Sequence, residues 1–438
     1  MARTDRDEYE AGAALRKTTP RSSHAAWKPP KNRPSPASVL FAQDTDRLQD
    51  LVPIRHARMA ESPFAFLRGS AAVMAADLAV LPRTGITVQA CGDAHAANFG
   101  VYASPERTLV FDVNDFDETL PGPWEWDLKR LATSLVVAAR DQGETDEFAR
   151  GLARRAATGY REEMHTLTGM TNLEVYYRIV RADDTVAEIE RKGARSRAKS
   201  LMDKARSRTN LHAVAKLTTQ VDGALRIADD PPLLERDASP ETVGLVRKSL
   251  AEYARTLRAD VAALLRSYDY VDAGRKVVGV GSVGTRCLVV VLQGHDAQDP
   301  LILQVKEAKR SVLEPYLTRS VYHQQGRRVV TGQQMLQAVS DVFLGWSPHF
   351  YWRQLRDMKG SVEFAKLRPY GMKLYAGLCA RTLALAHARS GPRFQIAGYL
   401  GRSTVFDEAI ADFALAYADQ TVADHAEFVG RLRAQAEV

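Results

Sequence analysis

The spacing of apolar residues divides the chain into helical, β-rich and again helical stretches. Apolar positions recur with a helical period from Trp124 to about Tyr270. Five shorter stretches have the same period: 39–51, 62–81, 327–341, 371–389 and 403–429. Elsewhere between Lys276 and Leu355, short apolar runs alternate with glycines and polar turns, which is typical of strands. The pattern predicts an α+β protein with a β-rich segment between helical ones.

A smaller β-rich segment interrupts the first helical region. The apolar run ITVQAC (86–91) predicts a strand, and it leads into the polar loop CGDAHAANFG (91–100). Two more apolar runs, 98–103 and 108–115, flank the turn sequence SPER and predict a β-hairpin. The polar loop therefore lies between a strand and a hairpin.

Residues 1–38 have a different composition from the rest of the chain. They are rich in proline, serine and basic residues. Such a segment has few apolar side chains to bury, so we expect a flexible arm, mobile or draped over the surface of a partner.

The composition indicates a globular protein of the cytoplasm. The 438 residues, 45% of them hydrophobic, suffice for a large core in more than one unit. The three cysteines are far apart and form no CxxC pair, which argues against a disulfide framework or a zinc site. No apolar run approaches the roughly 20 residues that span a bilayer. The N-terminus lacks the apolar segment of a signal peptide.

The charge favours anionic ligands. The net charge of +7 is compatible with nucleotides and with nucleic acid. The densest basic stretch, 189–208, also carries acids and has no interleaved aromatic residues, so it is poor support for nucleic-acid binding. We therefore expect a nucleotide ligand and no nucleic acid or membrane partner.

The polar loop carries the side chains that phosphoryl transfer requires. This chemistry needs a carboxylate near the acceptor hydroxyl, oxygen ligands for Mg²⁺, and cations or backbone amides on the phosphates. Asp93 and Asn98 have the spacing of the base and the asparagine in a kinase catalytic loop. Asp93 would orient the acceptor and Asn98 would bind the metal ion. His95 is interpreted as a residue that orients the loop through hydrogen bonds.

An acidic run follows the hairpin and offers a second metal ligand. DVNDFDE (112–118) would repel itself unless a cation or a basic group compensates. Asp112 is preferred by its position at the end of the apolar strand, with Asp115 as the alternative. The competing interpretation is an acidic turn exposed to solvent.

A glycine-rich turn in the β-rich segment predicts a phosphate-binding site. Its sequence GVGSVG (279–284) contains Gly279, Gly281 and Gly284, with Ser282 inside the turn. A dinucleotide-binding motif would open a helix, but the next residues are strand-like. Lys306, on the following apolar strand, would neutralise the α- and β-phosphates. An unpaired ammonium there would be unfavourable, so we expect an acidic partner: Glu307, Glu314 or a residue of the next helix.

The last predicted strand, 348–355, would run along the base of the nucleotide. Backbone groups around Gln354 and Leu355 would then read the adenine. A buried edge strand explains the same residues.

These motifs carry a resemblance to two groups of proteins. CGDAHAANFG, LVFDVNDFDE and PWEWDLKRLA are similar to the HGDxHxxN, IDxxD and DLA motifs of aminoglycoside and choline phosphotransferases. In that group the aspartate matching Asp127 braces the catalytic loop. Most of the chain after residue 39 also resembles a bacterial family of uncharacterised proteins of the protein-kinase-like superfamily. The resemblance implies ATP and Mg²⁺ as cofactors.

The order of the motifs departs from that superfamily. The glycine turn and Lys306 follow Asp93, whereas kinases place them first. A circular permutation would explain this, because LALAHARSG (383–391) resembles the helix that normally precedes the catalytic loop. Cys91 also replaces the histidine that many of these relatives have.

The resemblance implies a circularly permuted, two-lobed protein-kinase-like fold and an ATP-dependent phosphotransferase with an unknown acceptor. The alternatives are an AMP transferase and a non-catalytic, pseudokinase-type nucleotide-binding protein. Arg58 and Arg68 would either pair with structural carboxylates or reach an acidic acceptor. Four segments follow: a basic arm (1–38), a helical lobe with the catalytic loop and metal-binding hairpin (39–270), a β-rich nucleotide lobe (271–360) and C-terminal helices on the helical lobe (361–438).

Overall fold

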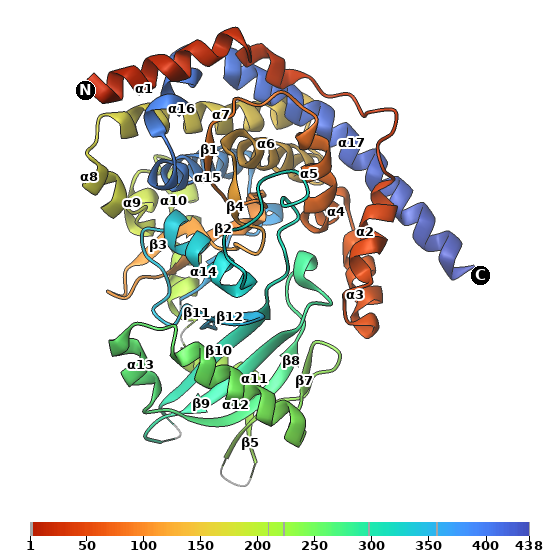
Figure 1. The fold of residues 1–438 in the computed structure, drawn as a ribbon, viewed down its shortest axis with the longest axis vertical. Helices are drawn as coiled ribbons and strands as arrows, with labels where there is room; N and C mark the ends of the chain where they lie inside the picture. Colours follow the sequence, from red (N-terminus) through yellow and green to blue (C-terminus); the bar gives the residue numbers. More distant parts are fainter. Residues whose placement is uncertain (1–2, 209, 222–223, 297, 356–357, 438) are drawn as a thin grey trace.

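The computed structural model describes residues 3–208, 210–221, 224–296, 298–355 and 358–437. It is a mixed α+β structure, as the periodicity predicts. Figure 1 shows an antiparallel sheet with its own helices in the lower half and a bundle of longer helices in the upper half. The loop and the hairpin that follows β1 lie on the side of the bundle that faces the sheet.

The main sheet has six described strands, all paired antiparallel, in the order β11-β12-β10-β9-β8-β7. Their bounds are β7 Leu234–Arg236, β8 Asp269–Lys276, β9 Cys287–Gln293, β10 Pro300–Glu307, β11 Gly345–Ser347 and β12 Phe350–Gln354. The glycine-rich turn connects β8 to β9, and β10 carries Lys306, so strand, turn, strand and lysine-bearing strand follow each other as predicted.

Each face of this sheet packs against helices, and strand alternation decides which side chains go where. On β9, Val290 and Leu292 pack with α12 (Pro240–Ala254) and α13 (Ala259–Leu265). Their neighbours Val289 and Val291 pack with α11 (Asn210–Leu217) on the other face. Because side chains alternate along a strand, a run of valines and leucines can fill both cores. These helices therefore belong with the sheet, whereas the sequence pattern put residues up to 270 with the other helices.

The helical bundle supplies the largest core. It is built around α6 (Trp124–Arg140), whose residues from 124 to 139 are all buried. Three long helices surround it: α7 Asp146–Thr168, α15 Pro369–Ser390 and α17 Val405–Ala436. Small side chains at the contacts, such as Ala153 and Ala157 of α7 and Ala380 of α15, are fully buried and allow close packing.

Short strands and helices hold the loop between the bundle and the sheet. β1 (Thr87–Ala90) pairs with β4 (Leu120–Pro123), and β2 (Phe99–Ala103) pairs with β3 (Leu109–Val113) in the predicted hairpin. β13 (Gly360–Ser361) adds a third strand to the hairpin. α14 (Gln325–Leu336) packs against both β12 and α15. Residues 91–98 are thereby fixed between β1 and β2.

The other elements are shorter. They are α2 Pro36–Asp44, α3 Val52–Ala60, α4 Pro63–Gly69, α5 Ala71–Ala79, α8 Asn172–Tyr177, α9 Ala182–Ala187, α10 Lys192–Arg206, α16 Arg393–Leu400, β5 Thr218–Val221 and β6 Ala224–Ile227. Short 3-10 helices cover Leu15–Lys17, Arg21–Ala25, Gln49–Leu51, Ala96–Asn98, Val280–Ser282 and Phe364–Lys366. Over the described residues, no helix has the length and apolarity needed to cross a bilayer.

The N-terminal segment is ordered, which corrects the prediction of a flexible arm. α1 (Arg3–Ala14) packs on α16, as Figure 1 shows along the top of the molecule. A Cβ atom on Gly12 or on Gly398 would overlap the backbone of the opposite helix, so the two backbones touch there. Further along, His24 is fully buried and Arg33 binds both Asp77 and Asp424. Arg16 and Arg21 of the segment donate to carbonyls at the end of α16, so several of its basic side chains bind the chain itself, which the composition does not indicate.

The Gly398→Val substitution tests this contact. The added side chain has no space against Tyr9, so α1 should separate from α16 while the rest of the fold remains. Hydrogen exchange should show loss of amide protection over residues 3–14. Gly430→Val is the matched control because a Cβ atom at Gly430 meets nothing within 4 Å. Equal protection in both variants would contradict the packing.

Candidate active site

The loop after β1 is held by a buried carboxylate of α6. Asp127 accepts the backbone N–H of Cys91 at 2.6 Å and that of Gly92 at 2.9 Å. Gly92 has a φ of +83°, a conformation that glycine adopts without strain. His387 of α15 lies 3.1 Å from the same carboxylate and 2.8 Å from the hydroxyl of Tyr160. A single side chain thus joins the loop to two helices.

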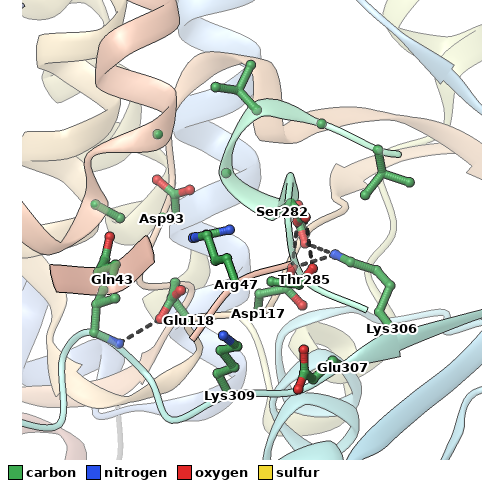
Figure 2. Close-up of a pocket in the computed structure, with 18 of the residues that line it drawn as sticks. Gln43, Arg47, Asp93, Asp117, Glu118, Ser282, Thr285, Lys306, Glu307 and Lys309 are labelled. Atoms are coloured by element: carbon green, nitrogen blue, oxygen red, sulfur yellow. Dashed lines mark hydrogen bonds and ion pairs between the residues drawn. The ribbon is translucent and has the colours of Figure 1, made fainter. Parts of the chain in front are cut away.

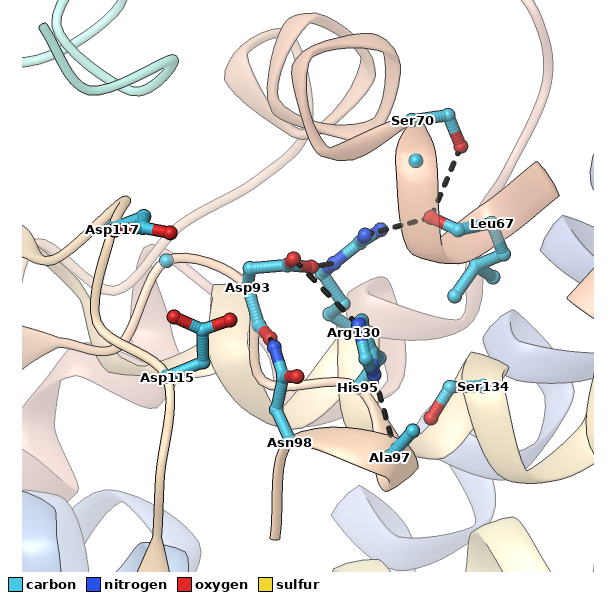
Figure 3. A network of polar contacts seen from close by, with 12 residues as sticks. Leu67, Ser70, Asp93, His95, Ala97, Asn98, Asp115, Asp117, Arg130 and Ser134 are labelled. Atoms are coloured by element: carbon cyan, nitrogen blue, oxygen red, sulfur yellow. Dashed lines mark hydrogen bonds and ion pairs between the residues drawn. The ribbon is translucent and has the colours of Figure 1, made fainter. Parts of the chain in front are cut away.

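Asp93 projects from this loop and forms an ion pair with α6. Its Oδ1 accepts from Nε of Arg130 at 2.5 Å, and Arg130 also donates to the carbonyl of Leu67 (Figure 3). Burial raises the pKa of Asp93 to about 6, although Arg130 acts in the opposite direction. His95 lies with Nε2 3.7 Å from the Asp93 carboxylate and accepts the N–H of Ala97. Burial lowers the pKa of His95 well below its usual value, which favours a neutral, orienting imidazole.

Asn98 lies at the end of the loop with its amide oriented. The side-chain nitrogen donates to the carbonyl of Asp93 at 2.8 Å. Because the nitrogen is used in this way, the amide oxygen is the atom that could bind a cation. Figure 3 shows Asn98 and Asp115 below Asp93, with Asp117 above Asp115 on the left.

The structure reverses the order of preference between the two metal-ligand candidates. Asp112 is buried on β3 and accepts the N–H of Val113, and it does not line the cavity at Asp93. Burial raises its pKa to about 6, against the effect of Arg389. Asp115 lies beyond the strand end and lines the cavity together with Asp93. Position along the strand suggested Asp112, but strand alternation turns its side chain away.

Lys306 has an acidic partner that neither sequence candidate supplied. Its Nζ is hydrogen-bonded to Oδ2 of Asp117 and lies 3.7 Å from Oδ1 of Asp115. Glu307 instead pairs with Arg286 at 2.9 Å, so its expected contact with Lys306 is wrong. The carboxylate of Glu314 likewise forms no ion pair with Lys306. The acidic run after the hairpin therefore compensates the buried ammonium of β10.

The glycine turn lies over this ion pair. Ser282 is 3.3 Å from Asp117, and Gly284 has a φ of +85°. Gly279 and Gly281 line the same cavity, and a Cβ atom at Gly281 would lie 3.4 Å from the carbonyl of Arg68 in α4. The turn is thus brought against helices near the N-terminus.

These groups line one cavity of about 850 Å³ between the sheet and the bundle. Figure 2 shows Arg47 and Glu118 between Asp93 and Lys309, with Asp117, Ser282 and Lys306 to their right. Burial raises the pKa of Glu118 to about 7. The cavity contains Asp93, His95, Asn98, Asp115, Lys306 and all the predicted turn residues except Gly284.

A second cavity of about 530 Å³ adjoins the first and contains Gln354 and Leu355. The two cavities share Val278, Gly279 and other residues at their boundary. The N–H of Gln354 donates to the carboxylate of Asp341, and the N–H of Leu355 donates to the carbonyl of Ile302. These two donors are already used, so the carbonyls of this stretch are the backbone groups that remain for the predicted contact with a base. Residues 356 and 357, which follow the predicted strand 348–355, lie outside the described residues.

The cavity offers few protein ligands to a cation. Within the described ranges, no group of three or more His, Cys, Asp or Glu side chains has the arrangement of a metal site. Mg²⁺ usually has only one or two protein carboxylates, with water and phosphate as its other ligands. Oδ1 of Asp115 is buried and has no hydrogen-bond partner. Asn98 and Asp115 therefore offer oxygen donors of the kind that a magnesium ion would need.

Sequence reasoning missed three basic residues of the site. Arg130 follows Asp127 by three positions, and this helical spacing places both on the side of the loop. Arg328 of α14 donates to the carbonyls of Thr119 and Asp117 and so holds the acidic run. Arg47 donates to the carbonyl of Val283 in the glycine turn. Only Arg130 had a signal in the sequence, because the other two contacts join distant segments.

The fold and the site define a mixed α+β protein with a polar cleft between an antiparallel sheet and a helical bundle. Residues 47–431 match the family described as "Uncharacterized protein conserved in bacteria (DUF2252)", and the chain belongs to this family. No curated protein and no solved structure matches the chain. The family description names no activity, so activity is inferred from the cleft.

Replacement of Asp127 by asparagine tests the support of the loop. The variant loses a charged acceptor of two N–H groups and a partner of His387, which should lower the unfolding free energy by about 2 kcal/mol. Asp146→Asn removes an exposed ion pair with Arg140, so its effect should stay below about 1 kcal/mol. Urea unfolding compares the two. Equal losses would mean that Asp127 does not support the loop.

Proposed function

We propose that this protein is an ATP-dependent phosphotransferase with a two-lobed, kinase-like and circularly permuted fold. The observation that carries the proposal is the convergence of Asp93, Asn98, Asp115 and Lys306 on one cavity beneath a glycine turn. These residues come from segments far apart in the chain, and they are the groups that phosphoryl transfer requires.

The packing of α15 supports the permutation. The end of this helix lies beside β1, with the hydroxyl of Ser390 3.3 Å from the N–H of Gln89. His387 of the same helix contacts Asp127, which holds the loop. In a kinase-like chain the helix before the catalytic loop has this role, so α15 would be that helix, reached through space instead of along the chain.

The two adjoining cavities suit the two ends of a nucleotide. The adenosine would occupy the smaller cavity, and the phosphates would pass Gly279 and reach Lys306 in the larger one. The ammonium of Lys306 would neutralise phosphate oxygens, and its present partners Asp115 and Asp117 would then become available to a cation. Asn98 and Asp115 would hold Mg²⁺, which supplies charge neutralisation on the phosphates.

Asp93 would position the acceptor. In the proposed reaction the hydroxyl oxygen of the acceptor bonds to the γ-phosphorus, the bond from that phosphorus to the bridging oxygen of ADP breaks, and the hydroxyl proton passes to Asp93. A buried carboxylate with a pKa of about 6 is ionised at neutral pH and can accept it. Arg130 holds this carboxylate in place.

A non-catalytic nucleotide-binding protein is the second candidate. The ion pair between Arg130 and Asp93 favours it, because the guanidinium already occupies one carboxylate oxygen. Labelled ATP separates the candidates. Release or transfer of the γ-label supports phosphoryl transfer, incorporation of the α-label supports AMP transfer, and binding without either supports the non-catalytic alternative.

Two aspartate variants test the metal site. Asp115→Asn should weaken binding of the non-hydrolysable analogue AMP-PNP with Mg²⁺ by about tenfold or more, or about 1.4 kcal/mol. Asp112→Asn should change it by less than about twofold, because Asp112 does not line the cavity. Isothermal titration calorimetry with Mg²⁺ and with EDTA measures both. An effect of Asp112→Asn as large as that of Asp115→Asn would refute the assignment.

Lys306→Met tests the phosphate contact. Methionine has about the length of the aliphatic part of lysine but lacks the ammonium. Affinity for AMP-PNP should therefore fall by about tenfold or more. Lys366→Met, at an exposed lysine paired with Glu363, is the control and should bind as the wild type does. Unchanged binding in Lys306→Met would exclude the proposed path of the phosphates.

A further inference from the structure

Arg68 is a partly buried cation of the cleft, and the described residues supply no hydrogen-bond partner for its Nε atom. It lies near the end of α4 and lines the cavity beside Asp93. Within the part of the chain that the structure describes, its guanidinium forms no ion pair. The other guanidinium at Asp93 belongs to Arg130, which is bound to the carboxylate and to a carbonyl. Arg68 is therefore a surplus charge directed at the cleft.

A half-buried guanidinium without a partner is unfavourable unless something binds it. Arginine keeps its proton in proteins, so the charge cannot be relieved by deprotonation. Burial lowers the pKa of Arg68, and the nearby charges of Asp93 and Asp115 offset only part of this effect. The fold thus maintains a desolvated cation with donors available to a ligand, which is the arrangement that binds oxyanions.

Two more cations line the same cavity. Arg47 is almost fully buried, with Nη1 donating to the carbonyl of Val283 and Nε 3.5 Å from Asp44. Lys309 donates from Nζ to the carbonyl of Asp46 at 2.5 Å. The contacts to the carbonyls of Val283 and Asp46 are with neutral groups, so they fix the side chains without removing their charge. Asp44 offsets part of the charge of Arg47, but the same carboxylate is also paired with Arg55.

Glu307 and Glu118 lie near Arg47 and Lys309, as Figure 2 shows. Glu307 is paired with Arg286, which leaves Glu118 as the other carboxylate beside these cations. Glu118 accepts a backbone N–H with Oε2, and burial raises its pKa to about 7. Part of its population is therefore protonated at neutral pH, which limits its repulsion of an anion.

We propose that Arg68, with Arg47 and Lys309, forms an oxyanion subsite that binds an anionic group of the acceptor. This inference rests on the proposed function for the role of the acceptor, but the subsite itself does not require a nucleotide. It names the acceptor class as a hydroxyl compound that already carries a phosphate or carboxylate group. Such an acceptor would present its hydroxyl to Asp93 while Arg68 binds its anionic group.

The position of the subsite separates it from the nucleotide path. Lys306 and the glycine turn bind the phosphates in the proposed arrangement, and Arg68 does not line the smaller cavity. A polycationic acceptor, such as an aminoglycoside, would meet an unpaired cation beside Asp93. The resemblance to aminoglycoside phosphotransferases therefore does not extend to their acceptor.

Inorganic phosphate is the probe for the subsite. Calorimetric titration of the full-length protein with phosphate compares wild type, Arg68→Gln, Arg68→Lys and the exposed control Arg83→Gln. Loss of a charge-assisted contact should weaken phosphate binding by about tenfold or more in Arg68→Gln. Arg68→Lys should recover part of the affinity, and Arg83→Gln should match wild type. Thermal unfolding temperatures of both Arg68 variants equal to that of the wild type exclude misfolding as the cause.

Two further measurements test whether the bound anion belongs to the acceptor and not to the nucleotide. The Lys306→Met background should retain the phosphate binding that depends on Arg68, even if the protein binds no nucleotide. The ratio of AMP-PNP to ADP affinity should be the same in Arg68→Gln and wild type. A selective loss of AMP-PNP would show that Arg68 reads the γ-phosphate and would overturn the proposal. Phosphate binding unchanged in Arg68→Gln would overturn it as well, whatever the result for nucleotide binding.

Discussion

The hydrogen bonds of the Asp127 carboxylate are the contacts on which the rest of the site depends. They tie a loop after β1 to α6, and through His387 they tie it to α15. The carboxylate is buried in the core of the bundle, where an unsatisfied charge would be strongly destabilising. The loop therefore has one favourable position, and Asp93 and Asn98 take their places from it. Chain order matters little to this arrangement, because α15 reaches the loop from a segment far along the sequence.

The second constraint is the compensation of charge across the cleft. Lys306 is buried on a strand of the sheet, and its partners Asp115 and Asp117 belong to a loop of the bundle. This contact joins the sheet to the helical bundle at the larger cavity. Arg328 adds to it by binding the backbone of the acidic loop from α14. Such pairs balance much of the buried charge. The guanidinium of Arg68 differs, because the described residues provide no ion-pair partner for it.

Much of the fold follows from local patterns. Alternating apolar residues predict the hairpin of β2 and β3 and the strands on both sides of the glycine turn, because a strand buries every second side chain. Helical periods predict α6, α7 and α15, because a helix buries the side chains that recur about every 3.6 residues on one face. The N-terminal segment is the clear failure. Its basic composition suggests a flexible arm, but Arg33 is neutralised by Asp77 and Asp424, which lie far away in sequence.

The sequence by itself determined the α+β class, the loop with Asp93 and Asn98, and the lysine on a strand after a glycine turn. These depend on periodicity and turn chemistry, which neighbouring residues encode. Only the tertiary structure decided that Asp115 and not Asp112 reaches the cleft, that Asp117 binds Lys306, and that Arg68 remains unpaired. Those outcomes depend on which distant segments meet in a low-dielectric interior, where each buried charge must find a partner or a ligand.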